Sequence, residues 1–179
     1  AMALTGLTLV LHAKFDAAAC IADIFRYRCT YLPAVPTMLQ KLVDHPGLKP
    51  GDLASLRRIM TGGAPVPAAL LAKVLQATGG QTQVLTGYGL TEASALVTLA
   101  HVELGVDGEV LRGRTIGRVL DGMELGVRGE DGSDLAVDEI GEFVIRGPNV
   151  MAGYYNAPEA NAEVFDRGWL RTGDVGYID

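Results

Sequence analysis

The chain has 179 residues, of which 49% are hydrophobic and 20% charged, and this composition excludes an intrinsically disordered protein. Its length suffices for one large domain or two small ones with a buried core. The formal net charge of −6, without a long basic run, argues against binding to the backbone phosphates of nucleic acids.

The cysteines and the N-terminal apolar stretch indicate the cellular compartment. Cys20 and Cys29 are the only two cysteines, and their spacing matches no metal-binding motif. We interpret them as free buried thiols of a cytoplasmic protein. Residues 7–11 are too few to span a membrane, and no signal-peptide pattern precedes them. We therefore expect a cytoplasmic protein without a transmembrane segment or a nucleic-acid partner.

A strand and a helix are predicted first along the chain. Residues 8–11 are apolar or β-branched and predict a buried strand. Asp16 is the expected N-cap of the helix that follows, because its carboxylate can accept from free N–H groups of the first turn. The spacing i, i+3, i+4, i+7 predicts the buried face of that helix as Ala18, Ile21, Ala22 and Phe25.

Strands and helices then alternate. Strands are predicted at residues 30–32, 56–60 and 84–85, separated by helices that begin near Pro36 and Pro67. The apolar faces of these two helices are predicted to be Met38, Leu39, Leu42 and Val43 in one, and Leu70, Leu71, Val74 and Leu75 in the other.

This alternation predicts an α/β fold, a mostly parallel sheet flanked by helices. In such sheets ligands bind beyond the carboxyl ends of the strands. Two glycine-rich stretches, residues 62–65 and 87–89, follow predicted strands at such ends. They are the strongest physical indication of a binding site.

The pattern changes after Leu99, where glycines become frequent. We expect one subdomain over residues 1–102 and a small antiparallel β-barrel-like subdomain over residues 103–179. Asp131-Gly132 is a hairpin turn signal. In the second subdomain, strands are predicted at 116–120, 123–128 and 142–146, short helices at 151–155 and 158–164, and a turn at 172–174.

The glycine-bracketed stretch after the strand at 84–85 carries two chemically useful groups. Thr91 offers a neutral hydroxyl donor and Glu92 an anionic oxygen ligand, the two groups that a phosphate and its metal ion require. The alternative is a strand-to-loop turn with a solvated threonine and glutamate. The small or apolar residues 93–96 are compatible with an apolar acyl tail.

Three motifs together resemble a known family. The segment Gly87-Tyr88-Gly89-Leu90-Thr91-Glu92, with Gly62-Gly63-Ala64-Pro65 upstream and residues 168–174 (GWLRTGD) downstream, resembles the adenylate-forming (ANL) superfamily. Within it the chain is similar to acyl-CoA synthetases of the fatty-acid or aryl-acid kind. Residues 150–155 (VMAGYY) are also in the style of the family.

The resemblance implies a two-step reaction with ATP and CoA. A small-molecule carboxylic acid attacks the α-phosphate of ATP to give an acyl-adenylate and pyrophosphate, and the thiol of CoA then displaces AMP. Mg²⁺ and directed donors are expected to neutralise the phosphates, because the two reacting groups are both anions.

The resemblance also implies residue roles for adenosine. Tyr88 would stack on the adenine, and Asp174, which only accepts hydrogen bonds when ionised, would take both ribose hydroxyls. The opposite side of the base would be lined by Gly62, Gly63, Ala64 and Pro65.

Other residues are implied to act on the phosphates and the acid. Gly87 and Gly89 would leave room for the acyl group and phosphate, and Leu90 completes this nucleotide-binding motif. Thr91 would hydrogen-bond the α-phosphate, and Glu92 would bind Mg²⁺. For each residue an ordinary turn, cap or solvated side chain is the alternative. All three motifs in family order make these alternatives improbable together.

Two parts of the family pattern are expected outside the chain. The phosphate loop should lie upstream of residue 1, and the C-terminal domain with its catalytic lysine should follow Asp179. We therefore expect a middle segment of a larger enzyme that is inactive by itself. In such a segment the apolar surface against which the missing parts would pack is exposed, so we expect homo-oligomers.

Two other functions compete with the CoA ligase. One is an amino-acid-activating adenylation module that loads a carrier protein, which more often has proline at the position of Leu90. The other is a nucleotide-binding module without catalytic activity. The sequence does not distinguish which acid or acyl chain length is used.

Overall fold

The computed structural model describes residues 6–64, 66–104, 110–111 and 115–179. The chain forms two compact units, one of residues 1–86 with 100–115 and one of residues 87–99 with 116–179. Along the sequence, the chain passes from the first unit into the second at residue 87, returns to the first at residue 100 and enters the second again at residue 116. The predicted division after residue 102 stays a prediction.

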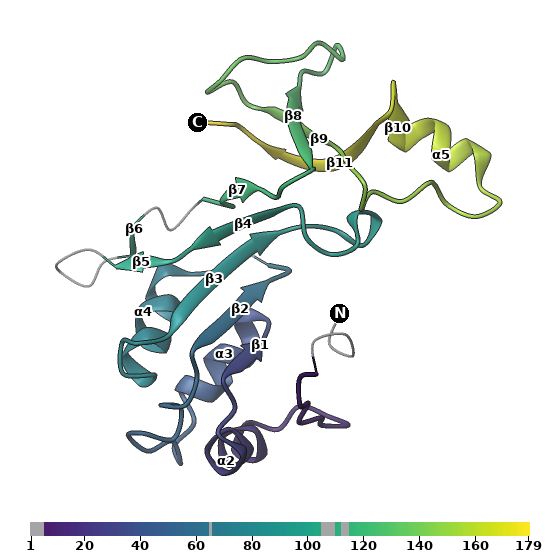
Figure 1. Cartoon of the computed structure of the whole chain (residues 1–179). Helices are drawn as coiled ribbons and strands as arrows, with labels where there is room; N and C mark the ends of the chain where they lie inside the picture. Colours follow the sequence, from purple (N-terminus) through teal and green to yellow (C-terminus); the bar gives the residue numbers. More distant parts are fainter. Residues whose placement is uncertain (1–5, 65, 105–109, 112–114) are drawn as a thin grey trace. The chain divides into compact units, whose positions relative to one another are not determined.

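The first unit alternates helices with strands (Figure 1). Its elements are α2 (Ala17–Tyr27), β1 (Tyr31–Pro33), α3 (Pro36–Val43), β2 (Arg58–Gly62), α4 (Ala68–Ala77), the first part of β3 (Gln83–Tyr88) and the end of β4 (Thr98–His101). A separate two-stranded antiparallel ribbon consists of β5 (Glu103–Leu104) and β6 (Val110–Leu111).

The main sheet has the strand order β1-β2-β3-β4-β7, with β7 at Arg118–Val119. Strands β1 and β2 pair in parallel, and β3 runs in the same direction in Figure 1. Strand β7 pairs with β4 antiparallel. The sheet is therefore mixed but mostly parallel, and the predicted α/β fold is confirmed.

Helix starts and one helix face agree with the sequence predictions. The Asp16 carboxylate accepts from the Ala19 N–H at 2.8 Å, so Asp16 caps α2, and Pro36 begins α3. The predicted face of α4 is buried in the core of the first unit. That core also takes Ile59 from β2 and Val84 from β3, so the helices cover the sheet through these side chains.

Two predictions in the N-terminal part are wrong. Residues 8–11 form no strand, and Leu11 is 82% exposed, because no other described strand pairs with them. The predicted face of α2 is also wrong, since Ile21 and Ile24 are buried whereas Phe25 is exposed. The stripe that packs inward is Ala17, Cys20, Ile21 and Ile24, which has the same helical spacing.

The second unit contains a four-stranded antiparallel sheet with the order β10-β11-β9-β8. Its elements are the 3₁₀ turn η1 (Thr91–Ala93), β7, β8 (Glu124–Arg128), β9 (Gly141–Arg146), α5 (Pro158–Val164), β10 (Phe165–Asp166) and β11 (Trp169–Gly176). The predicted antiparallel β unit and the helix at 158–164 are confirmed.

Other predictions in the second unit are only partly right. Gly132 has φ +77° in a turn, as the Asp131-Gly132 signal indicates. Residues 151–155 form no helix, so that prediction is wrong. The predicted turn at 172–174 is a register shift inside the single strand β11, between Arg171 and Val175.

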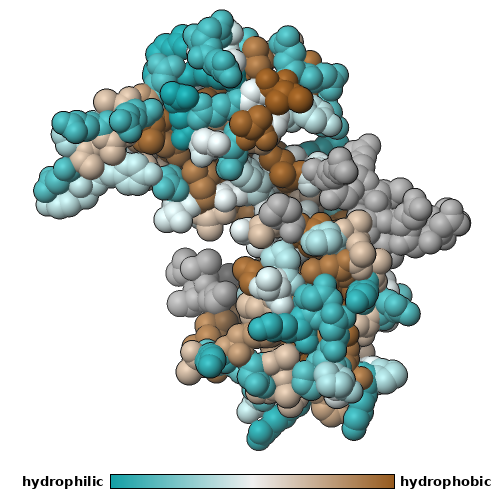
Figure 2. All heavy atoms as spheres, turned by 180° about the vertical axis from the view of Figure 1, so that it is seen from behind, coloured by the Kyte–Doolittle hydropathy of each residue, from teal (hydrophilic) through white to brown (hydrophobic). Residues whose placement is uncertain are grey.

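A second hydrophobic core holds this unit together. Its buried members are Ala93, Val97, Met123, Ile145 and Leu170. Helix α5 contributes no fully buried residue, and the view from behind in Figure 2 shows mainly hydrophilic colours in this region. Two core members, Ala93 and Val97, belong to the segment between β3 and β4, so this segment is anchored in the unit.

Candidate functional site

The segment between β3 and β4 forms a tight loop with unusual backbone conformations. After η1, Ser94 has φ +52° and Ala95 has φ +86°, values that L residues rarely adopt. The N–H of Ala95 donates to the carbonyl of Leu90 at 3.2 Å and closes the loop. Such strained residues persist only where the surroundings fix them.

Gly89 is needed by the protein's own backbone at this loop. A Cβ added to Gly89 would lie 2.0 Å from the carbonyl oxygen of Ala95 and 2.8 Å from the Cα of Leu96. The absent side chain therefore lets the returning chain cross directly over β3. Its predicted role beside acyl group and phosphate stays a prediction.

A second segment, residues 149–151, fixes the loop from the outside. The side-chain amide of Asn149 donates to the carbonyls of Ala93 and Leu96 at 3.0 and 2.9 Å. In return the Ser94 hydroxyl donates to the carbonyl of Asn149 at 3.0 Å. These bonds satisfy the carbonyls of the strained loop, which would otherwise depend on water.

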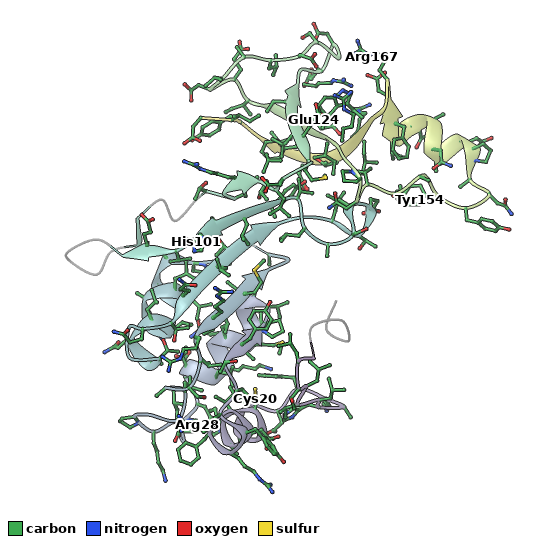
Figure 3. The ribbon with its side chains drawn as sticks, in the orientation of Figure 1. Cys20, Arg28, His101, Glu124, Tyr154 and Arg167 are labelled. Carbon is green, nitrogen blue, oxygen red and sulfur yellow. The ribbon has the colours of Figure 1, made fainter. Side chains whose placement is uncertain are left out.

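Glu92 is held at both its backbone and its side chain. The N–H of Met151 donates to the carbonyl of Glu92 at 2.7 Å. The phenol of Tyr154, which Figure 3 labels before α5, donates to Oε1 of Glu92 at 2.8 Å. This hydrogen bond to a carboxylate raises the pKa of Tyr154, since losing the proton would place two anions together.

Tyr88 and Asp174 are in direct contact. The Tyr88 phenol donates to Oδ2 of Asp174 at 2.6 Å, although 86 residues separate them. The Tyr88 ring also packs at a tilt against Phe143, with centroids 5.8 Å apart. Burial first, and the hydrogen bond to Asp174 second, raise the pKa of Tyr88 to about 12.

The bulge in β11 presents Asp174 at this position. Gly173 adopts φ +75° within it, a conformation that favours glycine. The Asp174 N–H donates to Oγ1 of Thr172 at 3.1 Å, and the Thr172 hydroxyl donates to the carbonyl of Phe143 at 2.8 Å. Asp174 is exposed, so its carboxylate is open to ligands.

An open depression of about 460 Å³ adjoins the loop. Thr91 is exposed at its rim, whereas Ala93 is fully buried in the core of the second unit. The compatibility of residues 93–96 with an apolar acyl tail stays a prediction. The lining residues are Gly89, Leu90, Thr91, Ser94 and Ala95.

The other predicted residues lie in or directly after β2 and in β3. Gly62 ends β2, and Gly63 and Ala64 follow it as exposed residues of the first unit. Pro65 lies outside the described residues. Gly87 is a half-buried residue of β3. The structure brings Tyr88 together with Asp174, and supplies Glu92 with a partner.

Sequence reasoning missed Asn149 and Tyr154 as members of the site. Residues 150–155 resemble the family, but neither an asparagine nor a tyrosine indicates a chemical role by its type alone. A neutral amide or phenol becomes informative only when its partner is known.

The Glu92 carboxylate suits a magnesium ion whose other ligands are nucleotide phosphate oxygens and water. Within the described residues, no cluster of three or more His, Cys, Asp or Glu side chains could hold a metal alone. Mg²⁺ usually takes one or two carboxylates and completes its shell with phosphate oxygens and water. Glu92, one half-buried glutamate beside the exposed Thr91 hydroxyl, fits that pattern.

The comparisons with known proteins define the class. Residues 1–155 match the family model described as AMP-binding enzyme. The chain therefore belongs to the AMP-binding enzyme family, as the three motifs indicated. No helix in the described part of the chain is long and apolar enough to cross a membrane.

Relatives of several specificities resemble this chain. It is 42% identical, over 98% of its length, to a Mycobacterium tuberculosis CoA ligase named for a methyl-dioxo-octahydro-indenyl propanoyl group, and covers 32% of that protein. It is 36% identical, over 97% of its length, to the long-chain-fatty-acid–CoA ligase of Bacillus subtilis, and covers 30% of it.

Among solved structures, it resembles O-succinylbenzoate coenzyme A synthetase of Bacillus subtilis in complex with ATP and a magnesium ion. The TM-score is 0.83 and the identity 32%, over 99% of this chain and 35% of the other. The chain thus spans about a third of the length of the relatives it matches.

Proposed function

We propose that the chain carries the central part of the nucleotide site of an ATP-dependent carboxylic acid–CoA ligase. The observation that most supports this proposal is the 2.6 Å hydrogen bond between Tyr88 and Asp174. It joins an aromatic ring and an exposed carboxylate from two distant motifs, and these are the two groups that an adenosine requires. The family membership of the chain supports the same proposal.

Each side chain has a chemical task in this proposal. The Tyr88 ring stacks on adenine, and its hydrogen bond to Asp174 fixes the carboxylate that accepts the ribose hydroxyls. Thr91, exposed at the loop, donates its hydroxyl to the α-phosphate. The rigid loop beneath it holds that donor in place before the reaction, which lowers the reorganisation needed for catalysis.

Glu92 is the residue that would hold Mg²⁺ together with the nucleotide phosphates. The ion supplies neutralisation of phosphate charge, which lets an anionic carboxylate approach the α-phosphate. The residues of this chain bind and orient the nucleotide. The roles of Gly62, Gly63 and Ala64 at the adenine stay a prediction, as does a cytoplasmic location.

The acid is of an apolar or aromatic class in this proposal. The three relatives named above are named for a fused-ring propanoate, a long-chain fatty acid and a succinylbenzoate, so the family likeness leaves the acid open. Leu90 favours a CoA ligase over an amino-acid adenylation module. A panel of fatty, aryl and amino acids, each with CoA, separates the two.

Titration calorimetry with AMP tests the nucleotide site. The complete protein that carries this chain should bind AMP, and Asp174→Asn should weaken binding at least tenfold, because a neutral amide accepts from the ribose less strongly than a carboxylate. Asp179→Asn is the matched control and should bind as the wild type does. Equal affinity in all three proteins would refute the assignment of Asp174.

A further inference from the structure

We infer that Tyr154 is a positioning residue that sets the orientation of the Glu92 carboxylate for a divalent cation. The inference rests on the proposed function, in which Glu92 binds Mg²⁺. It starts from the 2.8 Å hydrogen bond between the Tyr154 phenol and Oε1 of Glu92.

The bond engages Oε1, and no hydrogen bond from another described residue reaches Oε2. A phenol is a neutral donor, so the charge of Glu92 remains available to attract a cation. With Oε1 engaged, rotation of the carboxylate is restricted, and Oε2 is the oxygen directed to a ligand. Partners of this kind fix the geometry of metal-binding carboxylates in proteins.

The backbone of Glu92 is fixed by the same outer segment. The N–H of Met151 donates to the carbonyl of Glu92 at 2.7 Å, three residues before Tyr154. The Asn149 amide holds the carbonyls of Ala93, the last residue of η1, and of Leu96. The segment 149–154 therefore controls both the position of residue 92 and the direction of its side chain.

Tyr154 is itself held in place by Asn161 of α5. The N–H of Tyr154 donates to Oδ1 of Asn161 at 2.7 Å, and Nδ2 of Asn161 donates to the carbonyl of Tyr154 at 2.9 Å. A Cβ on Gly153 would lie 3.0 Å from Oδ1 of this amide, so glycine lets the two approach. The Asn161 side-chain amide thus pairs with both the N–H and the carbonyl of Tyr154, as the backbone of a neighbouring strand does.

These contacts have little to contribute to stability. Tyr154 is 39% exposed and α5 has no buried residue, so hydration competes with each bond. A surface network that adds little stability and ends on the carboxylate next to Thr91 is best explained by its effect on that carboxylate.

The test compares Tyr154→Phe with Tyr155→Phe in the complete protein. Tyr155 is 92% exposed and supplies a matched loss of one phenol hydroxyl in the same segment. ATP binding is measured by titration calorimetry at a series of Mg²⁺ concentrations. AMP binding without Mg²⁺ and the unfolding temperature are measured on the same samples.

For Tyr154→Phe we expect the Mg²⁺ concentration that gives half-maximal ATP affinity to rise about tenfold, the lower range for loss of a metal ligand's partner. AMP affinity and unfolding temperature should match the wild type, and Tyr155→Phe should match it in every measurement. A general structural defect would instead weaken AMP binding as well.

Two results would overturn the inference in distinguishable ways. If Glu92→Gln abolishes the Mg²⁺ dependence of ATP binding but Tyr154→Phe leaves it unchanged, the proposed function stands and Tyr154 has no positioning role. If ATP binding by the wild type does not depend on Mg²⁺, the assignment of Glu92 fails, and the inference fails with it.

Discussion

Substitution of Gly89 by alanine tests the loop geometry on which the site depends. The new methyl carbon would lie 2.0 Å from the Ala95 carbonyl oxygen, whereas ordinary van der Waals contact begins at 3.4 Å. The backbone at Ala95 must therefore move by about 1.4 Å, the difference between the two distances. The obstacle is main chain, so no change of side-chain rotamer relieves it.

The displacement has a cost that can be estimated. Overpacking by itself destabilises by about 1–3 kcal/mol. The shift also strains two hydrogen bonds, from Asn149 to the Leu96 carbonyl at 2.9 Å and from the Val97 N–H to the Tyr88 carbonyl at 2.9 Å, each with a net value of about 1 kcal/mol. We expect a loss of about 3 kcal/mol or more.

Trp169 provides the assay. It is the only tryptophan, and it lies in the second unit with Gly89, so its fluorescence during guanidinium unfolding reports on this unit. Gly129→Ala, in the same unit, is the control, because the atoms nearest to its new Cβ belong to side chains, with Oδ1 of Asp131 at 3.0 Å and Cδ2 of Leu135 at 3.4 Å. A loss below about 1 kcal/mol for Gly89→Ala would refute the argument that the backbones cross in contact.

Three further predictions concern the Tyr88 phenol, the core hydroxyls and the activity of the chain. Folding raises the pKa of Tyr88 to about 12, so the stability from its protonated phenol is complete below about pH 10 and is lost as the pH rises towards 12. The difference in tyrosinate absorbance between the wild type and Tyr88→Phe should therefore stay near zero at about pH 10.5. A difference that appears with a midpoint near pH 10 would contradict this prediction. The buried Thr61 hydroxyl has no hydrogen-bond partner among the described residues, so Thr61→Val should stabilise the first unit by about 1 kcal/mol in circular-dichroism melts. Thr82→Val is its control and should destabilise, because the Thr82 hydroxyl donates to the Leu56 carbonyl at 2.9 Å; stabilisation by both or neither would be inconsistent with this reasoning. Residues 1–179 alone should not catalyse ATP–pyrophosphate exchange with any fatty or aryl acid, and clear exchange by the purified chain would overturn that expectation.

The buried face of a helix can be predicted from the sequence where the helix has only one apolar stripe. In α4 a single apolar stripe includes Leu70 and Val74, and that stripe is buried. In α2 two stripes with helical spacing share Ile21, one with Ile24 and one with Phe25. The choice between them depends on which neighbours pack against the helix, and periodicity carries no information about that.

The same limit applies to the strand predicted at residues 8–11 and to the site. An apolar run becomes a strand only where a partner strand pairs with it, and pairing is a tertiary property. Tyr88 and Asp174 were predicted separately, but their contact depends on the bulge in β11, which no local signal announces. Asn149 and Tyr154 were overlooked because their importance lies in their partners.

Carboxylate-dependent ATP–pyrophosphate exchange by the complete protein tests the central claim most directly. We expect Mg²⁺-dependent exchange with at least one fatty or aryl acid. For Glu92→Gln we expect a loss of about a hundredfold or more, because the amide keeps the shape of the side chain but removes the charge that binds the cation. Exchange that Glu92→Gln leaves unchanged, or no exchange with any acid tested, would contradict the account.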